Sequence, residues 1–86
     1  MTTESPILKH DTIKTFLVRS LKPDRVTYGM GGTEPEAWNA YTIHGGRVAD
    51  AEVLIVTAPT ETSWGLDECG RVEHVSGPRI TAIEKP

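Results

Sequence analysis

Residues 51–59 read AEVLIVTAP and contain the only run of four large aliphatic side chains in this 86-residue chain. Three residues of the run are β-branched, and β-branched side chains suit a pleated surface better than a helix. Pro59 ends the stretch because proline has no N–H to donate to a neighbouring strand. An unbroken apolar run bounded by turn residues predicts burial on both faces. We therefore expect residues 51–58 to form the central strand of a sheet.

Length and composition indicate one small folded domain. Hydrophobic residues make up 37% of the chain and charged residues 24%, which argues against global disorder. We expect a single domain over residues 1–86, with residues 1–5 frayed and a thin core. The chain starts without a charged-then-apolar signal, and no apolar run reaches membrane-spanning length. These features predict a soluble, cytoplasmic protein with no membrane partner.

Residues 6–21 carry the pattern of an amphipathic helix. Four apolar side chains recur at helical spacing on one face: Ile13, Phe16, Leu17 and Leu21. Ser5 or Asp11 provides an N-cap, and Pro23 stops the helix. We predict that this N-terminal helix packs on the sheet.

Two interpretations compete for the next part of the chain. Residues 25–28 predict a first strand. Residues 33–36 match a helix capping box, which would start a short helix. Alternatively, residues 37–43 form a strand, and Gly45-Gly46 turns a hairpin into a continuous strand over 47–57. We favour the strand, because Gly-Gly between two apolar-bearing runs is the stronger signal.

The C-terminal third predicts an antiparallel meander. Strands are expected at 60–66, 71–75 and 79–84, separated by turns at 67–70 and 76–78. The predicted fold class is therefore α+β, with one N-terminal amphipathic helix packed on a bent, mostly antiparallel sheet of five or six strands. A meander, a cystatin-like roll and a small partly open barrel all fit this description.

The sequence contains no constellation typical of catalysis. Residues 29–32 (GMGG) lack the Lys-Ser/Thr of a phosphate-binding loop. Cys69 is the only cysteine, and its spacing to His44 and His74 matches no metal or nucleophile pattern. We assign no catalytic residue, no metal ligand and no cofactor, and favour a protein that is not an enzyme.

The sharpest functional feature is an acidic tract. Residues 48–70 contain five acids and no Lys or Arg. Acids on an exposed sheet face would complement a basic groove on another protein. This predicts a non-enzymatic protein-binding module, such as a small inhibitor or regulator, for which a virus or mobile element is one setting. The candidate partner-binding residues are Asp50, Glu52, Glu61, Trp64, Asp67 and Glu68. The competing interpretation is a solvated surface that keeps a small protein soluble.

A second hypothesis is a small ligand-binding roll or enzyme with a pocket between helix and sheet. Its candidate lining residues are Phe16, Trp38, Tyr41, His44 and His74. Direct nucleic-acid binding is disfavoured, because the aromatic residues lie among acids and the basic residues of the N-terminal part are scattered. The sequence leaves open whether the chain forms a homo-oligomer.

Overall fold

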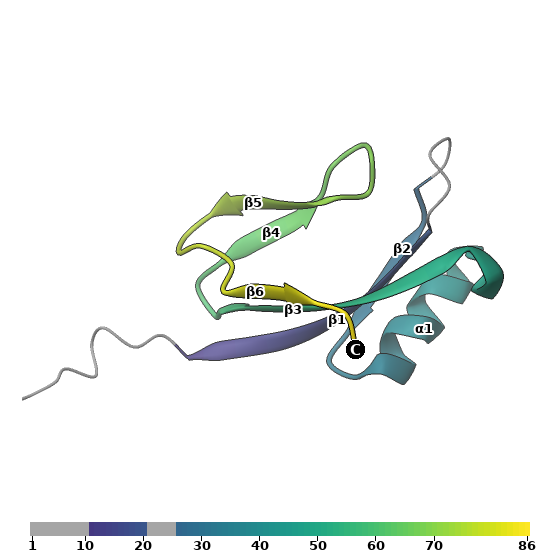
Figure 1. Cartoon of the computed structure of the whole chain (residues 1–86), viewed down its shortest axis with the longest axis horizontal. Coiled ribbons are helices and arrows are strands. Elements are labelled where there is room, and N and C mark those ends of the chain that lie inside the picture. The colour runs from purple at the N-terminus through teal and green to yellow at the C-terminus, as the bar shows by residue number, and fades with distance from the viewer. Residues whose placement is uncertain (1–10, 21–25) are drawn as a thin grey trace, which may run out of the picture.

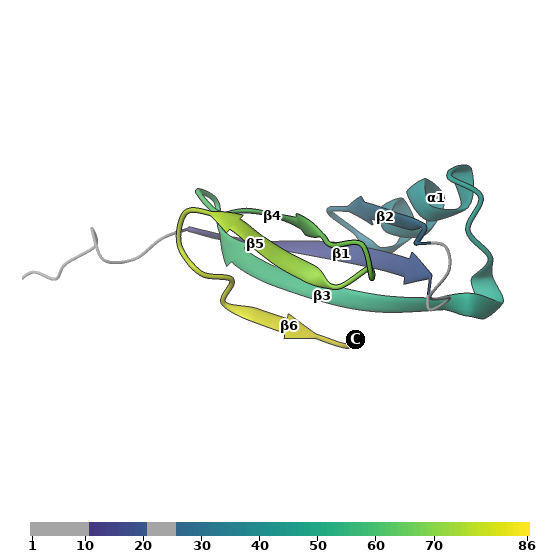
Figure 2. The ribbon, with the colours of Figure 1, turned by 90° about the horizontal axis from the view of Figure 1, so that it is seen from above.

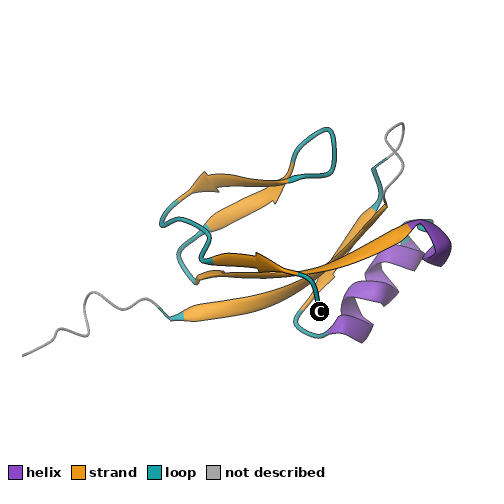
Figure 3. Cartoon of the chain, viewed as in Figure 1, coloured by secondary structure: helices purple, strands orange, loops and turns teal. Residues whose placement is uncertain are grey.

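The computed structural model describes residues 11–20 and 26–86 and has an α+β architecture (Figures 1 and 3). Its elements are β1 (Thr12–Ser20), β2 (Tyr28–Gly31), α1 (Glu34–Ile43), the short 3-10 helix η2 (Val48–Asp50), β3 (Ala51–Pro59), β4 (Ser63–Leu66), β5 (Val72–Ser76) and β6 (Ala82–Glu84). The strands form an antiparallel four-stranded sheet, in the order β2-β1-β3-β6, and a separate β4–β5 hairpin. The predicted α+β class is confirmed, but the strands divide between two sheets instead of one.

β3 is an interior strand, as residues 51–59 predicted. It pairs with β1 along its whole length, and with β6 on its other side. Leu54, Val56 and Ala58 are buried, whereas the alternating Val53 and Ile55 are half-buried. One face of the strand is therefore sealed from water, and the other is only partly covered.

The two faces of the four-stranded sheet are covered by different elements. Directly paired residues of antiparallel strands share a face, so Leu17 and its partner Leu54 lie on one face and Val18 on the other. α1 covers the Val18 face, where Val18 forms a buried cluster with Ala37 and Tyr41. The β4–β5 hairpin lies over the Leu17 face (Figures 1 and 2). We call these the helix-side face and the hairpin-side face.

The predicted N-terminal helix is wrong for residues 12–20, which form β1. Residues 6–10 and 21 of that prediction lie outside the described residues. The physical reason is that β1 is covered on both faces, so apolar residues follow one another at Phe16, Leu17 and Val18 without the polar alternation of a half-exposed strand. Their spacing resembles one face of a helix, but full-length pairing with β3 decides the conformation.

The favoured strand at 37–43 is also wrong, and the capping-box alternative is confirmed. α1 starts after Thr33, whose Oγ1 accepts a hydrogen bond from the Glu36 N–H, while Glu36 Oε1 accepts one from the Thr33 N–H at 3.1 Å. Pro35 occupies the first turn, where its missing N–H costs nothing. Gly45-Gly46 therefore follows the end of a helix and does not turn a hairpin.

Two smaller differences concern the ends of strands. Residues 48–50 of the strand predicted over 47–57 form η2 instead, so Asp50 precedes β3. A first strand is predicted at 25–28, of which residue 25 lies outside the described residues, but β2 begins at Tyr28 and includes part of the GMGG segment.

Glycine is needed on β2 because α1 packs directly on this strand. A Cβ on Gly29 would lie 2.2 Å from the Tyr41 backbone nitrogen.

Candidate functional site

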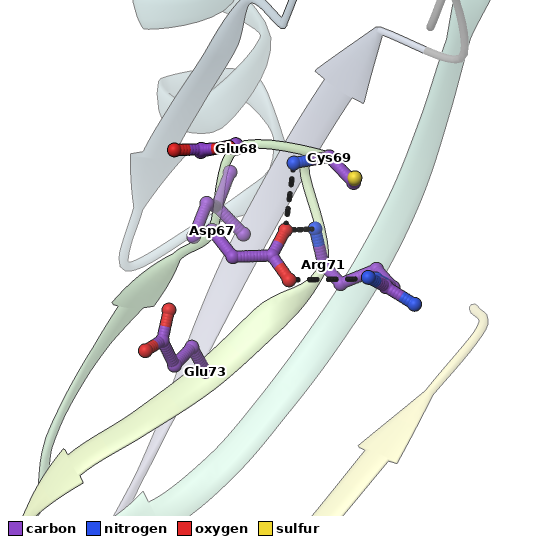
Figure 4. Close-up of a pocket in the computed structure, with 6 residues that line it drawn as sticks. Asp67, Glu68, Cys69, Arg71 and Glu73 are labelled. Atoms are coloured by element: carbon purple, nitrogen blue, oxygen red, sulfur yellow. Dashed lines mark hydrogen bonds and ion pairs between the residues drawn. The ribbon is translucent and has the colours of Figure 1, made fainter.

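The β4–β5 turn is built around one carboxylate, that of Asp67. Asp67 Oδ1 accepts hydrogen bonds from the N–H groups of Cys69 and Arg71, each at 2.9 Å (Figure 4). The Gly70 N–H donates to the Asp67 carbonyl at 3.0 Å, and the Asp67 N–H donates to the Arg71 carbonyl at 2.9 Å. Gly70 has φ of 80°, a conformation that glycine adopts without steric cost. The turn predicted at 67–70 is therefore confirmed, and its backbone is held by several bonds at once.

Asp67 is thus mainly a structural residue of the turn. The hydrogen bond from the Arg71 N–H is the main reason that the pKa of Asp67 lies below its ordinary value. The Cys69 N–H and the Arg71 guanidinium, whose Nε lies 3.4 Å from Asp67 Oδ2, lower the pKa further. Each of these contacts favours the charged carboxylate.

Acid is expected to loosen this turn. The lowered pKa means that ionised Asp67 stabilises the folded turn at neutral pH. This contribution is complete above the pKa of the unfolded chain, about 3.9, and is lost as the pH falls through the lower folded value. In an NMR titration, the Cys69 and Arg71 amide resonances should shift together with a midpoint below that of a free aspartate. Asp67→Asn should abolish the step, and a midpoint at or above about 3.9 would contradict these hydrogen bonds.

A shallow hollow of about 500 Å³ lies beside the turn. Its lining residues are Leu66, Asp67, Glu68, Cys69, Arg71 and Glu73. The Glu68 and Glu73 carboxylates point to the same side in Figure 4, whereas the Cys69 sulfur and the Arg71 guanidinium point to the other. Both glutamates are exposed, and neither carboxylate has an ion pair within residues 11–20 and 26–86. The hollow therefore has one side on which negative charge is not neutralised.

Arg19 of β1 connects this turn to the four-stranded sheet. Its Nη1 donates a hydrogen bond to the Gly70 carbonyl at the tip of the hairpin. Its Nε and Nη2 donate to Glu52 Oε1 of β3 at 3.2 and 2.9 Å. Lys85 Nζ lies 2.9 Å from the other Glu52 oxygen. The pKa of Glu52 is lowered mainly by its hydrogen bond from Lys85 and next by the one from Arg19. This acid is therefore ionised and already paired with two cations.

The structure separates the acids that the sequence groups together. Glu52 is connected to the hairpin tip through Arg19, but Arg19 and Lys85 neutralise its charge. Glu61 lies after β3, at the opposite end of the hairpin, where its carbonyl faces Gly77. Asp50 ends η2, and Trp64 is half-buried on β4. Of the candidate acids, only Glu68 is both exposed and part of the hollow.

The residues of the alternative pocket fall into three places. Phe16, Trp38 and Tyr41 belong to the core on the helix-side face, where the two aromatic rings of α1 meet edge to face at 5.9 Å. His44 Nδ1 donates to the Tyr28 carbonyl at 3.0 Å, beside a hollow of about 310 Å³. His74 is on β5, where its Nε2 donates to the Gly77 carbonyl at 2.8 Å. The two imidazoles thus lie on different elements, each bonded to a backbone carbonyl.

Sequence reasoning missed two residues of this site. The acidic tract at 48–70 ends before Glu73, so the sequence pattern does not include this residue. Arg19 was assigned to a helix, and no sequence signal links it to Gly70, which is 51 positions away. Alternation within 71–75 could have placed Glu73 on the outer face of its strand.

Comparison with known proteins finds no match, so the function has to be inferred from the fold and the site. No family model, curated protein or solved structure matches this chain. Within the described ranges, no helix is long and apolar enough to cross a membrane. The same residues contain no group of three or more His, Cys, Asp or Glu side chains arranged to hold a metal ion.

Proposed function

We propose that this chain is a non-enzymatic protein-binding module, such as a small inhibitor or regulator, that docks its β4–β5 turn into a basic groove of a partner protein. The observation that carries the proposal is the unpaired charge of Glu68, in a turn held by several hydrogen bonds, and of Glu73, beside that turn on β5. A preorganised turn loses little conformational entropy on binding. Unneutralised acids on it would speed association with a basic surface and select against an acidic one.

The proposal narrows the acidic surface to the hairpin tip. Glu68 and Glu73 would contact the partner directly, whereas Asp67 would hold the backbone of the turn between them in place. Glu52 is already paired with Arg19 and Lys85, so it would act through the fold and not through the partner. We place such a module in the cytoplasm, where a lone exposed thiol such as Cys69 stays reduced.

A capture experiment tests the proposal. The tagged wild-type protein, the double variant E68K/E73K and the control E84K are used as bait in the same lysate, and retained proteins are identified by mass spectrometry. Glu84 is an exposed acid on β6, outside the hollow, so E84K controls for a charge reversal elsewhere. A purified partner should bind the wild type and E84K alike and the double variant about tenfold or more weakly. Equal binding to all three proteins would rule out the tip as the docking surface.

The alternative is a small ligand-binding roll or enzyme. Its support is the hollow of about 310 Å³ lined by Val26, Thr27, Tyr28 and His44, which places a phenol ring and an imidazole at one concave site. This function predicts that a small molecule, and no protein, raises the melting temperature, and that His44→Gln abolishes the shift. Capture of a partner through the hairpin tip with no such shift would favour the first proposal.

A further inference from the structure

The β4–β5 hairpin pairs only with itself among the strands described. Its strands form a two-stranded sheet with no ladder to β1, β2, β3 or β6. An isolated two-stranded hairpin is at best marginally stable in water. Its order must therefore depend on its contacts with the hairpin-side face, over which Figures 1 and 2 place it.

The base of the hairpin is tied to the end of β3. The Thr62 N–H donates to the Pro59 carbonyl at 2.9 Å, and Thr62 Oγ1 donates to the Pro78 carbonyl at 2.8 Å. The Thr81 N–H donates to the Thr57 carbonyl at 2.8 Å, where the chain enters β6. These bonds hold both connections of the hairpin together at one end, as a hinge would require.

The tip of the hairpin is held by Arg19. The Arg19 side chain is only 20% exposed, and its guanidinium donates both to Glu52 and to the Gly70 carbonyl. Glu52 thereby orients the planar group so that one nitrogen faces the tip. Leu17, Leu54 and Val56 belong to the hairpin-side face of β1 and β3, and they are 0%, 6% and 0% exposed.

We propose that the β4–β5 hairpin is a flap, hinged at Thr62 and Pro78 and latched by the contact between Arg19 and the Gly70 carbonyl. Releasing the latch lets the flap lift as a unit and uncovers the apolar residues Leu17, Leu54 and Val56. The β1–β3 ladder stays intact, because none of its strand pairs involves the hairpin. This proposal holds whether or not the acidic tip binds a partner.

Hydrogen–deuterium exchange of the full chain, read at residue level by NMR, tests the flap. In Arg19→Met, amides of residues 63–76 should exchange about tenfold or more faster than in the wild type, because a charge-assisted hydrogen bond is lost. Amides of the β1–β3 ladder should keep their rates within about twofold. Lys85→Gln is the matched control, because Lys85 binds the same Glu52 carboxylate as Arg19 but has no bond to the hairpin. It should leave the hairpin rates unchanged.

Two outcomes would overturn the flap. Unchanged hairpin rates in Arg19→Met would mean that the Gly70 contact is not a latch. An equal acceleration of hairpin and ladder amides would mean that the hairpin does not move as a separate unit. If Arg19→Met does not fold, Arg19→Lys decides by the same criteria, because an ammonium retains the charge but lacks the planar fork that reaches Glu52 and Gly70 together.

Discussion

A chain carrying Gly29→Ala is expected to unfold at a much lower urea concentration than the wild type, with a loss of about 3 kcal/mol in the free energy of unfolding. The added Cβ would lie 2.2 Å from the Tyr41 nitrogen and 2.7 Å from the Ala37 carbonyl oxygen. Both are backbone atoms of α1, so no side chain can rotate out of the way. The helix has to move off β2, and the buried cluster of Val18, Ala37 and Tyr41 opens with it.

Urea titration followed by circular dichroism measures this effect. Gly65→Ala is the control, because a Cβ on Gly65 of β4 would meet no atom within 4 Å. Its unfolding midpoint should match that of the wild type. If Gly29→Ala unfolded at the same urea midpoint as Gly65→Ala, α1 could not pack directly on β2.

The second large effect is expected for Val56→Asp, which should leave the chain unfolded at room temperature. Val56 is fully buried on the hairpin-side face and lies opposite Thr15 and Ile83 in the neighbouring strands. A carboxylate placed there would lose its hydration without gaining a partner, at a cost of several kcal/mol. That cost is comparable with the total stability of a small domain, about 5–15 kcal/mol.

Ile83→Asp provides the matched comparison for Val56→Asp. Ile83 is the β6 residue paired with Val56 and lies on the same face, but it is 48% exposed. Its carboxylate can reach water, so a cooperative thermal transition by circular dichroism should remain. Val56→Asp should show none. A cooperative melt of Val56→Asp near the wild-type temperature would contradict the burial of this face.

The run Val53–Val56 shows how far sequence reasoning reaches, since composition alone identified the interior strand. Composition cannot tell which of these four side chains is the most deeply buried, because each is a large aliphatic residue. The register with β1 and β6 assigns Leu54 and Val56 to the sealed face and Ile55 to the half-covered one. The choice of Val56 for substitution therefore depends on the fold.

The two wrong predictions have a common physical cause. Residues 12–20 and 37–43 carry local patterns compatible with either helix or strand, and tertiary pairing decides between them. β1 pairs with β3 along its full length. Residues 34–43, in contrast, are capped by Thr33 and pack closely against the glycines of β2. The capping box at 33–36 predicts the helix, whereas the Gly45-Gly46 pair favours a hairpin, and the packing of α1 on β2 decides for the helix.

The sequence shows which residues of the candidate site are acids, but it does not show which of these acids are paired with cations. Asp67, Glu68 and Glu52 all appear there as acids of one tract. Whether each is free depends on its partners, and those of Glu52 come from positions 33 residues away in either direction, Arg19 and Lys85. The sequence could therefore predict an acidic surface but could not identify which acids remain unpaired.

The sequence by itself determined the strand at 51–59 and the turns at 67–70 and 76–78, because each depends on local residue chemistry. Only the tertiary structure decided that residues 12–20 are a strand, that the hairpin forms a sheet of its own, and that Arg19 joins its tip to Glu52. These features depend on contacts between residues distant along the chain, and a local pattern does not specify which distant segments meet.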